Sequence, residues 1–386
     1  QLTSLDVGSN TALTYLQCYT NQLTYLNMRN GVTDSLSTFI ATGNSSLTCI
    51  ETLDPTYATA NWTSANGKID AGVTFSVICG AEAVTKWHVA TTGSDGSGSG
   101  TLASPLATIQ TGVNATSDGD TVSVAAGTYK ENVLLYKPNG VTTQNISVIG
   151  ENRNTTIIDG NQNGSVFHIM MNGGLFLKNF TIQNGKGHES TGGGIKVSYG
   201  DVVLDSLIVK NNVADGGGIW GINVNLTLKN SIIKSNSGGN GGAIRIQNDA
   251  PVRYNIVIYN TVFDGNTSNN QGGALWISYK NVDISESIFK NNSSSEKGTV
   301  YLAHSTVTVK KSILINNTSG GNDGAIRAAS SGIKIYSSLI ANNKGGGLAF
   351  GSGDSTAFLQ NVTVVNNSND AGIYANTKVR ILNSIV

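Results

Sequence analysis

The sequence predicts an all-β protein whose larger part is a solenoid of stacked parallel strands, a parallel β-helix. A glycine-rich phrase recurs through the second half of the chain, as in Gly241-Gly242-Ala243-Ile244 and Gly272-Gly273-Ala274-Leu275. Between these phrases, short stretches alternate apolar and polar residues, as in Leu226-Thr227-Leu228-Lys229, which is typical of a strand that buries one face. An asparagine closes each repeat, at Asn212, Asn236, Asn266, Asn292, Asn317, Asn343 and Asn367.

The spacing of the closing asparagines indicates how the coils stack. Successive members are 24, 30, 26, 25, 26 and 24 residues apart, and a fixed period of roughly 20–50 residues marks a repeat architecture. Near-equal steps bring equivalent residues of adjacent coils about 4.8 Å apart. We therefore expect the asparagines to form a ladder whose side-chain amides bond to one another. The long step of 30 requires an inserted loop, which we expect around residues 248–254.

The amino-acid composition limits which binding partners we expect. Lys+Arg and Asp+Glu each total 24, so the net charge is zero, and charged residues make up only 12% of the chain against about 25% in ordinary globular domains. Such a chain has no global attraction to nucleic acid or an anionic membrane, so we expect neither partner, no membrane insertion and a monomer. The 47 glycines and 4 prolines suit many tight turns.

The first 79 residues carry a different repeat. Leu-x-x-Leu phrases start at Leu2, Leu13 and Leu23, and they alternate with Asn10, Asn21 and Asn44. In leucine-rich repeats the leucines form an apolar column, and the asparagine satisfies backbone groups in the turn. We therefore expect a leucine-rich-repeat segment over 1–79, a linker over 80–86 and the solenoid over 87–386.

Part of this first segment has sequence motifs that resemble those of a known family. The run from Leu13 to Leu26 resembles leucine-rich repeats of secreted Bacteroidetes-type surface proteins, as does the segment from Leu47 to Cys79 with its Asn61-Trp62-Thr63 phrase. In that family the second segment caps the repeats, which implies a Cys49–Cys79 disulfide. Such a bridge would add about 3–4 kcal/mol of stability and require an oxidising compartment. Two free buried thiols are the other interpretation.

The next block, 87–135, is expected to cap the solenoid and form its first coil. Trp87-His88-Val89 reads as a strand, and Leu106, Ile109 and Val113 have helical spacing. Pro105 is expected at the first helical position, which suits its fixed φ. Gly119-Asp120-Thr121-Val122 and Gly127-Thr128-Tyr129 follow.

This order of phrases resembles the N-terminal part of secreted right-handed parallel β-helix proteins of the pectin-lyase-like superfamily. The resemblance implies a right-handed helix with coils over 145–386. Residues 190–370 also resemble chlamydial polymorphic outer-membrane repeats, which share the Gly-Gly-Ala-Ile and Phe-x-x-Asn phrases.

Because Gln1 opens inside a repeat and Val386 falls within a coil, we expect the sequence to be a piece of a longer chain, located outside the cell or on its surface.

One outward position on the first strand of each coil varies in a way that suggests recognition. It directly follows a buried aliphatic residue, and alternation points it away from the core. Exposed aromatic side chains and arginines together suit sugars that carry carboxylates, so we expect this column to bind a polysaccharide or a host or cell-surface glycan. Cross-strand aromatic and cation–π contacts that merely stabilise the sheet are the alternative. The expected ligand-binding residues are Lys196, Trp220, Arg245, Trp276, Tyr301, Arg327 and Tyr374, with Ala349 in the same series.

Catalysis is a second hypothesis for the same face. Lyases of the superfamily use an Arg or Lys base near carboxylates that hold Ca²⁺, so the resemblance makes Arg245, Lys196 and Asp215 the best candidates. A Ca²⁺ site needs several converging oxygens, whereas the acids here are spread thinly, so no cofactor or metal is expected, although Ca²⁺ remains compatible. A glycosidase needs two carboxylates about 5–10 Å apart. Asp201 and Asp205, or Asp215 with either of them, are the nearest candidates, but turn aspartates are more often local backbone acceptors.

Three functions follow from these patterns. The first, which we prefer, is an extracellular or cell-surface adhesin or polysaccharide-binding module that is not an enzyme. The second is a polysaccharide lyase or glycoside hydrolase that acts on an acidic polysaccharide. The third is a structural spacer on the cell surface.

Overall fold

A computed structural model describes residues 1–79, 85–136, 144–187, 191–247, 254–321, 323–351, 356–368 and 372–386. The chain divides into two compact units, the first formed mainly by Gln1–Gly127 and the second mainly by Ile149–Val386. Most of the expected linker, residues 80–84, lies outside the described residues, and Lys86 already belongs to a strand. Among the described residues no helix is both long and apolar enough to cross a membrane.

The first unit begins with short parallel strands and a helix. The leucines of the Leu-x-x-Leu phrases differ in exposure. Leu23 and Leu26 are fully buried, whereas Leu2 is 51% exposed. Asn44 accepts from the Leu23 amide and donates to the Cys18 and Ala41 carbonyls, so its side chain satisfies turn backbone groups as expected. The elements are β1 (Ser4–Asp6), β3 (Tyr25–Met28), β5 (Cys49–Thr52) and β6 (Thr74–Ser76) in one sheet, the pair β2 (Tyr15–Gln17) and β4 (Thr38–Ile40), and helix α1 (Pro55–Asn61).

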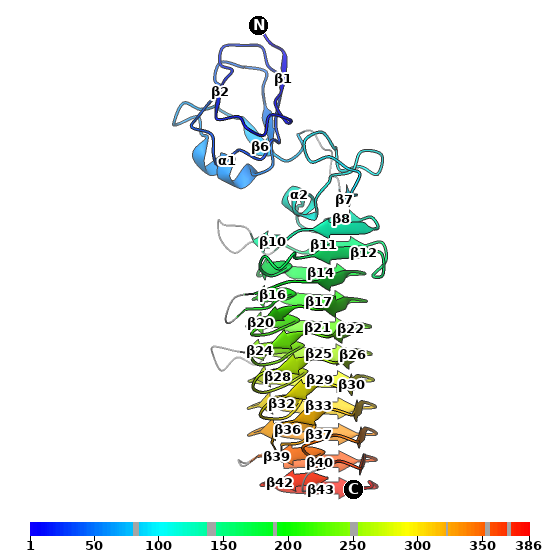
Figure 1. The fold of residues 1–386 in the computed structure, drawn as a ribbon. Coiled ribbons are helices and arrows are strands. Elements are labelled where there is room, and N and C mark those ends of the chain that lie inside the picture. Colours follow the sequence, from blue (N-terminus) through cyan, green and yellow to red (C-terminus); the bar gives the residue numbers. More distant parts are fainter. Residues whose placement is uncertain are drawn as a thin grey trace. The chain divides into compact units, whose positions relative to one another are not determined.

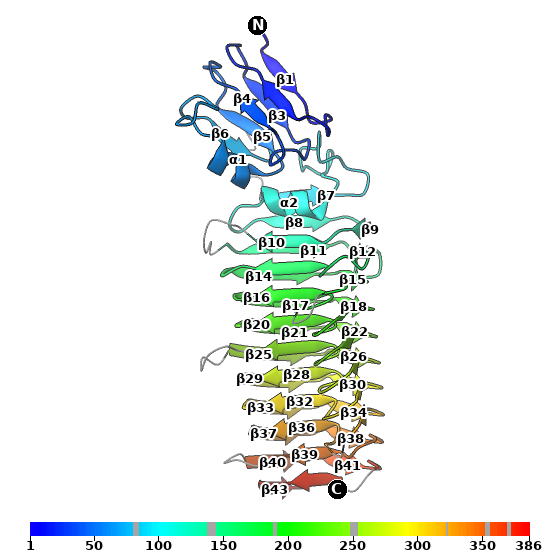
Figure 2. The same cartoon turned by 60° about the vertical axis from the view of Figure 1, so that its left-hand side comes forward.

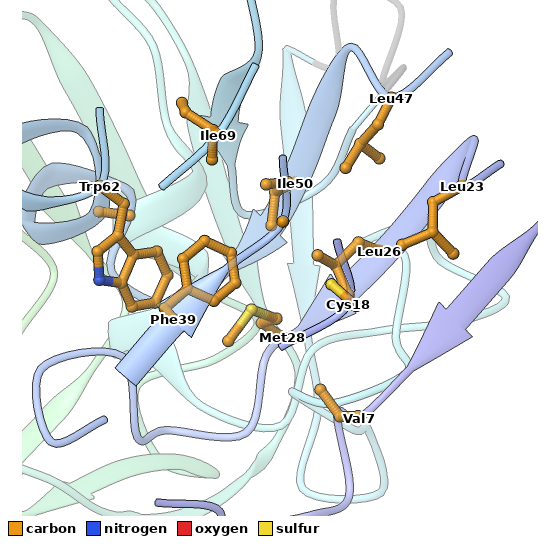
Figure 3. Close-up of a cluster of buried hydrophobic side chains, with 12 residues drawn as sticks. Val7, Cys18, Leu23, Leu26, Met28, Phe39, Leu47, Ile50, Trp62 and Ile69 are labelled. Carbon is orange, nitrogen blue, oxygen red and sulfur yellow. The ribbon is translucent and has the colours of Figure 1, made fainter. Parts of the chain in front are cut away.

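A single apolar cluster fills this part of the unit (Figure 3). Phe39 stacks on Trp62 with ring centroids 4.0 Å apart, and Trp62 also meets the edges of Tyr57 and Phe75. Full burial of one such side chain contributes about 1.5–3 kcal/mol. The Asn61-Trp62-Thr63 phrase therefore supplies the core residue beneath the helix.

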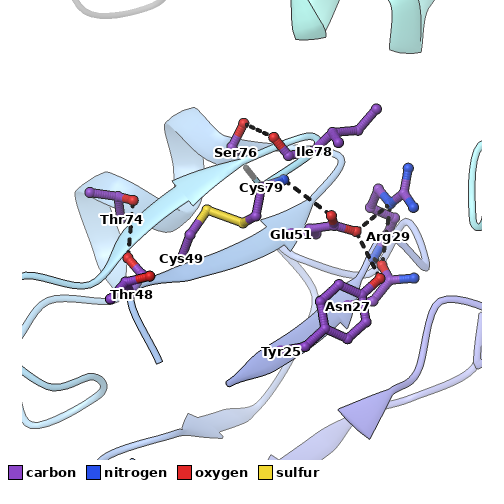
Figure 4. The surroundings of a disulfide bond; sticks show 10 residues. All are labelled: Tyr25, Asn27, Arg29, Thr48, Cys49, Glu51, Thr74, Ser76, Ile78 and Cys79. Atoms are coloured by element: carbon purple, nitrogen blue, oxygen red, sulfur yellow. Dashed lines mark hydrogen bonds and ion pairs between the residues drawn. A yellow bond between two sulfur atoms is a disulfide. The ribbon is translucent and has the colours of Figure 1, made fainter. Parts of the chain in front are cut away.

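A disulfide joins Cys49 to Cys79, with Cα atoms 5.8 Å apart (Figure 4). Beside it, Glu51 accepts hydrogen bonds from the Cys79 amide and the Tyr25 hydroxyl, each 3.1 Å long, and forms an ion pair with Arg29 at 3.2 Å. Burial and the carboxylate of Glu51 raise the pKa of Tyr25. Because Arg29 and Glu51 are both buried, either one alone would be an uncompensated charge.

The unit continues with β7 (Lys86–Val89), helix α2 (Ile109–Ala115) and β8 (Thr121–Val124), and β7 pairs with β8. The expectation that Pro105 opens the helix is wrong, because α2 starts at Ile109 and its N-cap is Thr108. The Thr108 hydroxyl accepts from the Thr111 amide, and Asp95 accepts from the Thr108 amide and hydroxyl. These polar contacts fix the start of the helix.

The second unit is a right-handed parallel β-helix, in which each coil contributes one strand to each of three long parallel sheets (Figures 1 and 2). Sheet 1 contains β10 (Val133–Tyr136), β13 (Phe167–Met170), β16 (Ile195–Ser198), β20 (Ile219–Ile222), β24 (Ile244–Gln247), β28 (Leu275–Ser278), β32 (Val300–Ala303), β36 (Ile326–Ala329), β39 (Leu348–Phe350) and β42 (Ile373–Ala375). Sheet 2 contains β11 (Ile146–Gly150), β14 (Gly174–Lys178), β17 (Asp201–Asp205), β21 (Asn225–Lys229), β25 (Tyr254–Tyr259), β29 (Lys280–Ser285), β33 (Thr306–Lys310), β37 (Gly332–Tyr336), β40 (Thr356–Gln360) and β43 (Lys378–Leu382).

The third sheet and a short fourth one complete each coil. Sheet 3 contains β9 (Gly127–Lys130), β12 (Thr156–Asp159), β15 (Thr181–Gln183), β18 (Ile208–Lys210), β22 (Ile232–Lys234), β26 (Val262–Asp264), β30 (Ile288–Lys290), β34 (Ile313–Ile315), β38 (Leu339–Ala341) and β41 (Thr363–Val365). The short sheet contains β19 (Val213–Ala214), β23 (Ser237–Gly238), β27 (Thr267–Ser268), β31 (Ser293–Ser294) and β35 (Thr318–Ser319). Inward aliphatic residues such as Ile244 and Ile246 are fully buried, so successive coils share one continuous core.

Left-handed residues make the corners between sheets. Between sheets 2 and 3 the corner is held by residues such as Asn179, Ser206 and Asn230, all with φ between 53° and 64°. Asparagine accepts this conformation better than most residues, which explains why asparagines precede so many strands. Residues 248–253, which contain most of the expected inserted loop, lie outside the described residues.

The closing asparagines form the expected ladder, called here the asparagine ladder. Asn292 is representative: its side-chain oxygen accepts from the amide and the side-chain nitrogen of Asn266, at 3.0 and 2.9 Å. Its own side-chain nitrogen donates to the Phe263 carbonyl and to Asn317, each at 3.0 Å. The ladder thus satisfies buried backbone groups from several neighbouring coils.

Candidate functional site

The register of sheet 1 brings the predicted ligand-binding residues into one file, called here the outward column. Pairing along the sheet joins, in order, His168, Lys196, Trp220, Arg245, Trp276, Tyr301, Arg327, Ala349 and Tyr374. Because neighbouring strands lie about 4.8 Å apart, each of these residues is flanked by the ones in the adjacent coils.

The expectation that the whole column is exposed is wrong at Trp220. This residue is only 6% exposed, and its indole nitrogen has no hydrogen-bond partner among the described residues. Its neighbours in register are the long side chains of Lys196 and Arg245, which lie within reach of the ring. Alternation sets which way a strand residue points, but side chains of adjacent coils decide how much of it reaches water.

The middle of the column is a stack of flat groups. The Arg245 guanidinium lies over the Trp276 ring, 5.2 Å from its centroid, and the Tyr301 ring stacks nearly parallel to Trp276, with centroids 6.3 Å apart and 13° between planes. Both faces of Trp276 are therefore occupied by the protein itself. A sugar cannot stack on Trp276 without displacing a neighbour, so this ladder favours the sheet-stabilising alternative at this residue.

Two arginines of the column are held by acids. Arg245 forms an ion pair with Asp215 through Nη1 and donates to Gln247 through Nη2 at 2.9 Å. Arg327 pairs with Asp323 through Nη1 at 2.7 Å. The Nε atoms of both arginines are buried and have no partner among the described residues. Burial lowers the pKa of Arg245.

Tyr301 and the two ends of the column differ in environment. Burial raises the pKa of the Tyr301 hydroxyl; Arg327 lowers this pKa and Asp323 raises it. Ala349 is fully buried, so the column is interrupted there, and Tyr374 beyond it is 46% exposed. Buried Ala349 thus separates Tyr374 from the partly accessible coils that run up to Arg327.

Two of the three catalytic candidates, Arg245 and Asp215, form an ion pair with each other. The Asp215 carboxylate is engaged by Arg245 and by the Asn240 amide at 3.2 Å, so its charge is neutralised. Lys196 has no ion pair among the described residues. Nor does the described part of the chain contain a group of three or more His, Cys, Asp or Glu side chains that would fit a metal ion.

The carboxylates considered for glycoside hydrolysis already interact with side chains of the protein. Asp201 accepts from the Asn225 side chain at 2.7 Å. Asp205 is buried and lies near the ammonium groups of Lys229 and Lys178, at 3.7 and 4.0 Å. Burial alone would raise the pKa of Asp205, but hydrogen bonds from Asn230 and Ser206 and the two lysines hold it below its usual value. Such an aspartate is a poor proton donor near neutral pH.

His168 is a member of the column that the sequence interpretation missed. Burial and the neighbouring Lys196 lower its pKa, and its Nε2 atom is buried without a partner among the described residues. The signal was present, because Phe167-His168-Ile169 repeats the buried–outward–buried pattern of later coils. It was hidden because neither of the two residues before Phe167 is a glycine, whereas each later coil has a glycine there.

Comparisons with known proteins add only a likeness of fold. No family model and no curated protein matches the sequence. Among solved structures, the chain resembles a GH136 lacto-N-biosidase from Eubacterium ramulus (12% identity, 78% of this chain and 68% of the other covered, TM-score 0.44). It also resembles pectate lyase Pel9A (15% identity, 78% of each chain, TM-score 0.41) and a rhamnogalacturonan lyase (17% identity, 73% and 76%, TM-score 0.32). These scores are low, so the fold rests on the strand register above, and no activity is carried over.

Proposed function

We propose that the β-helix binds an acidic polysaccharide along the outward column, outside the cell, and does not cleave it. The observation that carries this proposal is that buried polar atoms without hydrogen-bond partners gather in the outward column. Seven buried side-chain nitrogen or oxygen atoms lack a partner among the described residues, and four of them belong to the column, on His168, Trp220, Arg245 and Arg327. A buried polar group left without a partner costs about 1–3 kcal/mol, so a cluster of them in one file calls for a bound group.

Charge favours a carboxylated ligand. Arg327 uses Nη1 to hold Asp323 while its Nε has no described partner, which leaves one edge of the guanidinium fork for a second carboxylate. Lys196 adds a cation without an acid. Because the unpartnered atoms are covered, the side chains of the column must rotate when a uronate binds. The Trp276 faces are occupied, so ionic and hydrogen-bond contacts, rather than stacking, supply the affinity.

The compartment is part of the proposal. The Cys49–Cys79 disulfide suits an oxidising environment such as the cell exterior. An extracellular or cell-surface adhesin, acting as a monomer, would meet polysaccharides there.

Polygalacturonate hexamer is the probe, with binding measured by calorimetry at low salt. Arg327→Gln removes the fork and is expected to lower the affinity about tenfold or more, since hydrogen bonds to charged groups contribute about 1.5–3 kcal/mol. Lys334→Gln is the matched control: it removes one exposed cation from sheet 2 of the same coil and should leave binding within twofold. Equal losses in both variants, or no binding by the wild-type protein, would refute the proposal.

The alternative is cleavage of the same acidic polysaccharide by a lyase or glycoside hydrolase. A lyase base has to lose its proton. Burial lowers the pKa of Arg245, but the Asp215 carboxylate beside it favours the charged guanidinium. Ultraviolet absorbance of an unsaturated product and release of reducing ends, after long incubation with polygalacturonate, test this alternative directly. Either product would establish an enzyme, and absence of both binding and product would leave the spacer function.

A further inference from the structure

A second set of aromatic side chains lies at the corner between sheets 1 and 2, away from the outward column. In five described coils the corner residue has a left-handed backbone, with φ of 70° at Tyr199, 53° at Asn223, 56° at Tyr279, 49° at His304 and 47° at Ser330. Small polar residues and histidine accept this conformation readily, but a bulky tyrosine is a conformational outlier. Asn223 and Ser330 show that the fold does not require an aromatic residue here.

Two of these rings form a stacked pair on the surface. Tyr279 and His304 belong to adjacent coils and stack with centroids 4.7 Å apart and 11° between their planes. Tyr279 is 45% exposed and His304 is also exposed. The backbone fixes the pair, because the Tyr279 amide donates to the Ala303 carbonyl and the His304 amide to the Ala329 carbonyl, each at 3.0 Å.

The stack ends at His304. One imidazole face meets Tyr279, and the other is directed toward the next coil, where the corner residue is the short, exposed side chain of Ser330. A serine is too small to cover an imidazole ring, which agrees with the exposure of His304. Flat, exposed ring faces of this kind favour an apolar or C–H-rich ligand face.

Polar groups run beside the stack. Two residues beyond the corner, Asn281 donates to Asn255 at 3.1 Å, and Thr306 is its register partner in the following coil. All three side chains are exposed and present amide or hydroxyl groups that pair with sugar hydroxyls. The first charged side chain along β29 beyond Asn281 is Asp283, which is already paired with Lys310 at 3.1 Å.

We propose that the open face of His304, supported by Tyr279 and flanked by Asn281 and Thr306, binds a neutral pyranose ring that takes the place of a third ring above Ser330. The ligand class is a neutral, β-linked polysaccharide, whose pyranose ring presents C–H groups to the imidazole and hydroxyls to the amide row. This site lies apart from the outward column. The side chains that flank it carry amide and hydroxyl groups, whereas the column carries cations. The site would give one β-helix two sugar-binding surfaces of different specificity.

The probes are β-1,4-linked hexamers of glucose, mannose and xylose, titrated into the protein while histidine side-chain resonances are recorded by nuclear magnetic resonance. The chain has four histidines, so His304→Asn assigns the His304 signal. At least one hexamer is expected to shift that signal in the wild-type protein. His304→Asn should weaken binding about fivefold, the loss expected for one ring contact.

Ser330→His tests the geometry of the site. The new ring extends the stack into the space proposed for the sugar, and histidine already occupies this left-handed conformation at His304, so the fold is kept while binding is lost. Tyr199→Asn is the matched control, because Tyr199 has the same backbone conformation but its neighbour in the next coil is Asn223; its binding should stay within twofold of wild type.

The two proposed sites fail independently. His304→Asn should leave polygalacturonate binding unchanged, and Arg327→Gln should leave neutral-hexamer binding unchanged. The inference is overturned if none of the three hexamers shifts the His304 signal, or if His304→Asn and Ser330→His both bind as tightly as the wild-type protein. Equal weakening by Tyr199→Asn would also overturn it, because the stacked pair would then have no special part.

Discussion

Replacement of one rung of the asparagine ladder is expected to be among the most damaging substitutions in the β-helix. In Asn292→Ala the Asn266 amide loses its acceptor, and the contacts to the Phe263 carbonyl and to Asn317 are lost as well. Asn292 is 1% exposed, so water cannot replace these partners. Lost bonds contribute about 1 kcal/mol each and an orphaned buried donor costs about 1–3 kcal/mol. We therefore expect a loss of about 3–5 kcal/mol in the free energy of unfolding.

Asn281→Ala is the matched control for this prediction. Asn281 also donates its side-chain amide to an asparagine in a neighbouring coil, at 3.1 Å, but the bond is exposed, so water replaces it at a cost of about 0.5 kcal/mol. Both variants are unfolded with urea and followed by far-ultraviolet circular dichroism and tryptophan fluorescence. The reasoning about the ladder fails if the two variants lie within about 1 kcal/mol of each other.

Three further predictions concern glycine turns, the disulfide and pH. Gly242→Ala should destabilise the β-helix by more than about 3 kcal/mol in urea unfolding, because the added Cβ would collide with the Thr267 and Gly273 carbonyl oxygens. Gly332→Ala is the control: its added Cβ has no atom within 4 Å, so the substitution should be neutral or stabilising. Cys79→Ser opens a bridge with a sequence separation of 30 and should cost the first unit about 3–4 kcal/mol, measured by thermal unfolding; a reducing agent should have the same effect on wild type and none on the variant. Asp205→Asn should flatten the acid side of the stability profile, measured as the thermal midpoint against pH. Its folded-state pKa is lowered, so its contribution is present above the ordinary aspartate range and is lost as pH falls through the folded pKa; an unchanged acid slope would contradict this assignment.

The fold was predictable because the repeat constrains it at every coil. Near-equal steps between asparagines leave one stacking register, and observed pairs such as Trp276 with Tyr301 follow from it. The asparagine ladder was predictable for the same reason, since a buried amide repeated at equal intervals has its own copies as nearest partners. The helix start at Thr108 was not predictable from Pro105, because it depends on Asp95, a residue distant in sequence that accepts from the Thr108 amide.

The candidate site was predictable in position but not in environment. The sequence places Trp220 in the outward column, yet the residue is only 6% exposed, with the long side chains of Lys196 and Arg245 as its neighbours in register. The Arg245–Asp215 pair likewise joins residues of adjacent coils, and no spacing rule marks such a pair. The corner rings were missed for a different reason: Tyr279 and His304 stand in turn positions, where small polar residues are expected.

Stability and binding are separable to different degrees across this surface. The asparagine ladder has no freedom, because each side chain satisfies backbone groups of its neighbours. Arg245 is intermediate: it packs on Trp276 and neutralises Asp215, so its loss should reduce both stability and binding. The corner is the least constrained, since Asn223 occupies the same backbone conformation as Tyr279. A tyrosine retained there, against its conformational preference and half exposed to water, gains its stacking contact with His304 at the cost of backbone strain. Replacing it with asparagine relieves the strain, so Tyr279→Asn should lose sugar binding while its thermal midpoint stays level or rises, a combination that a purely structural ring pair would not produce.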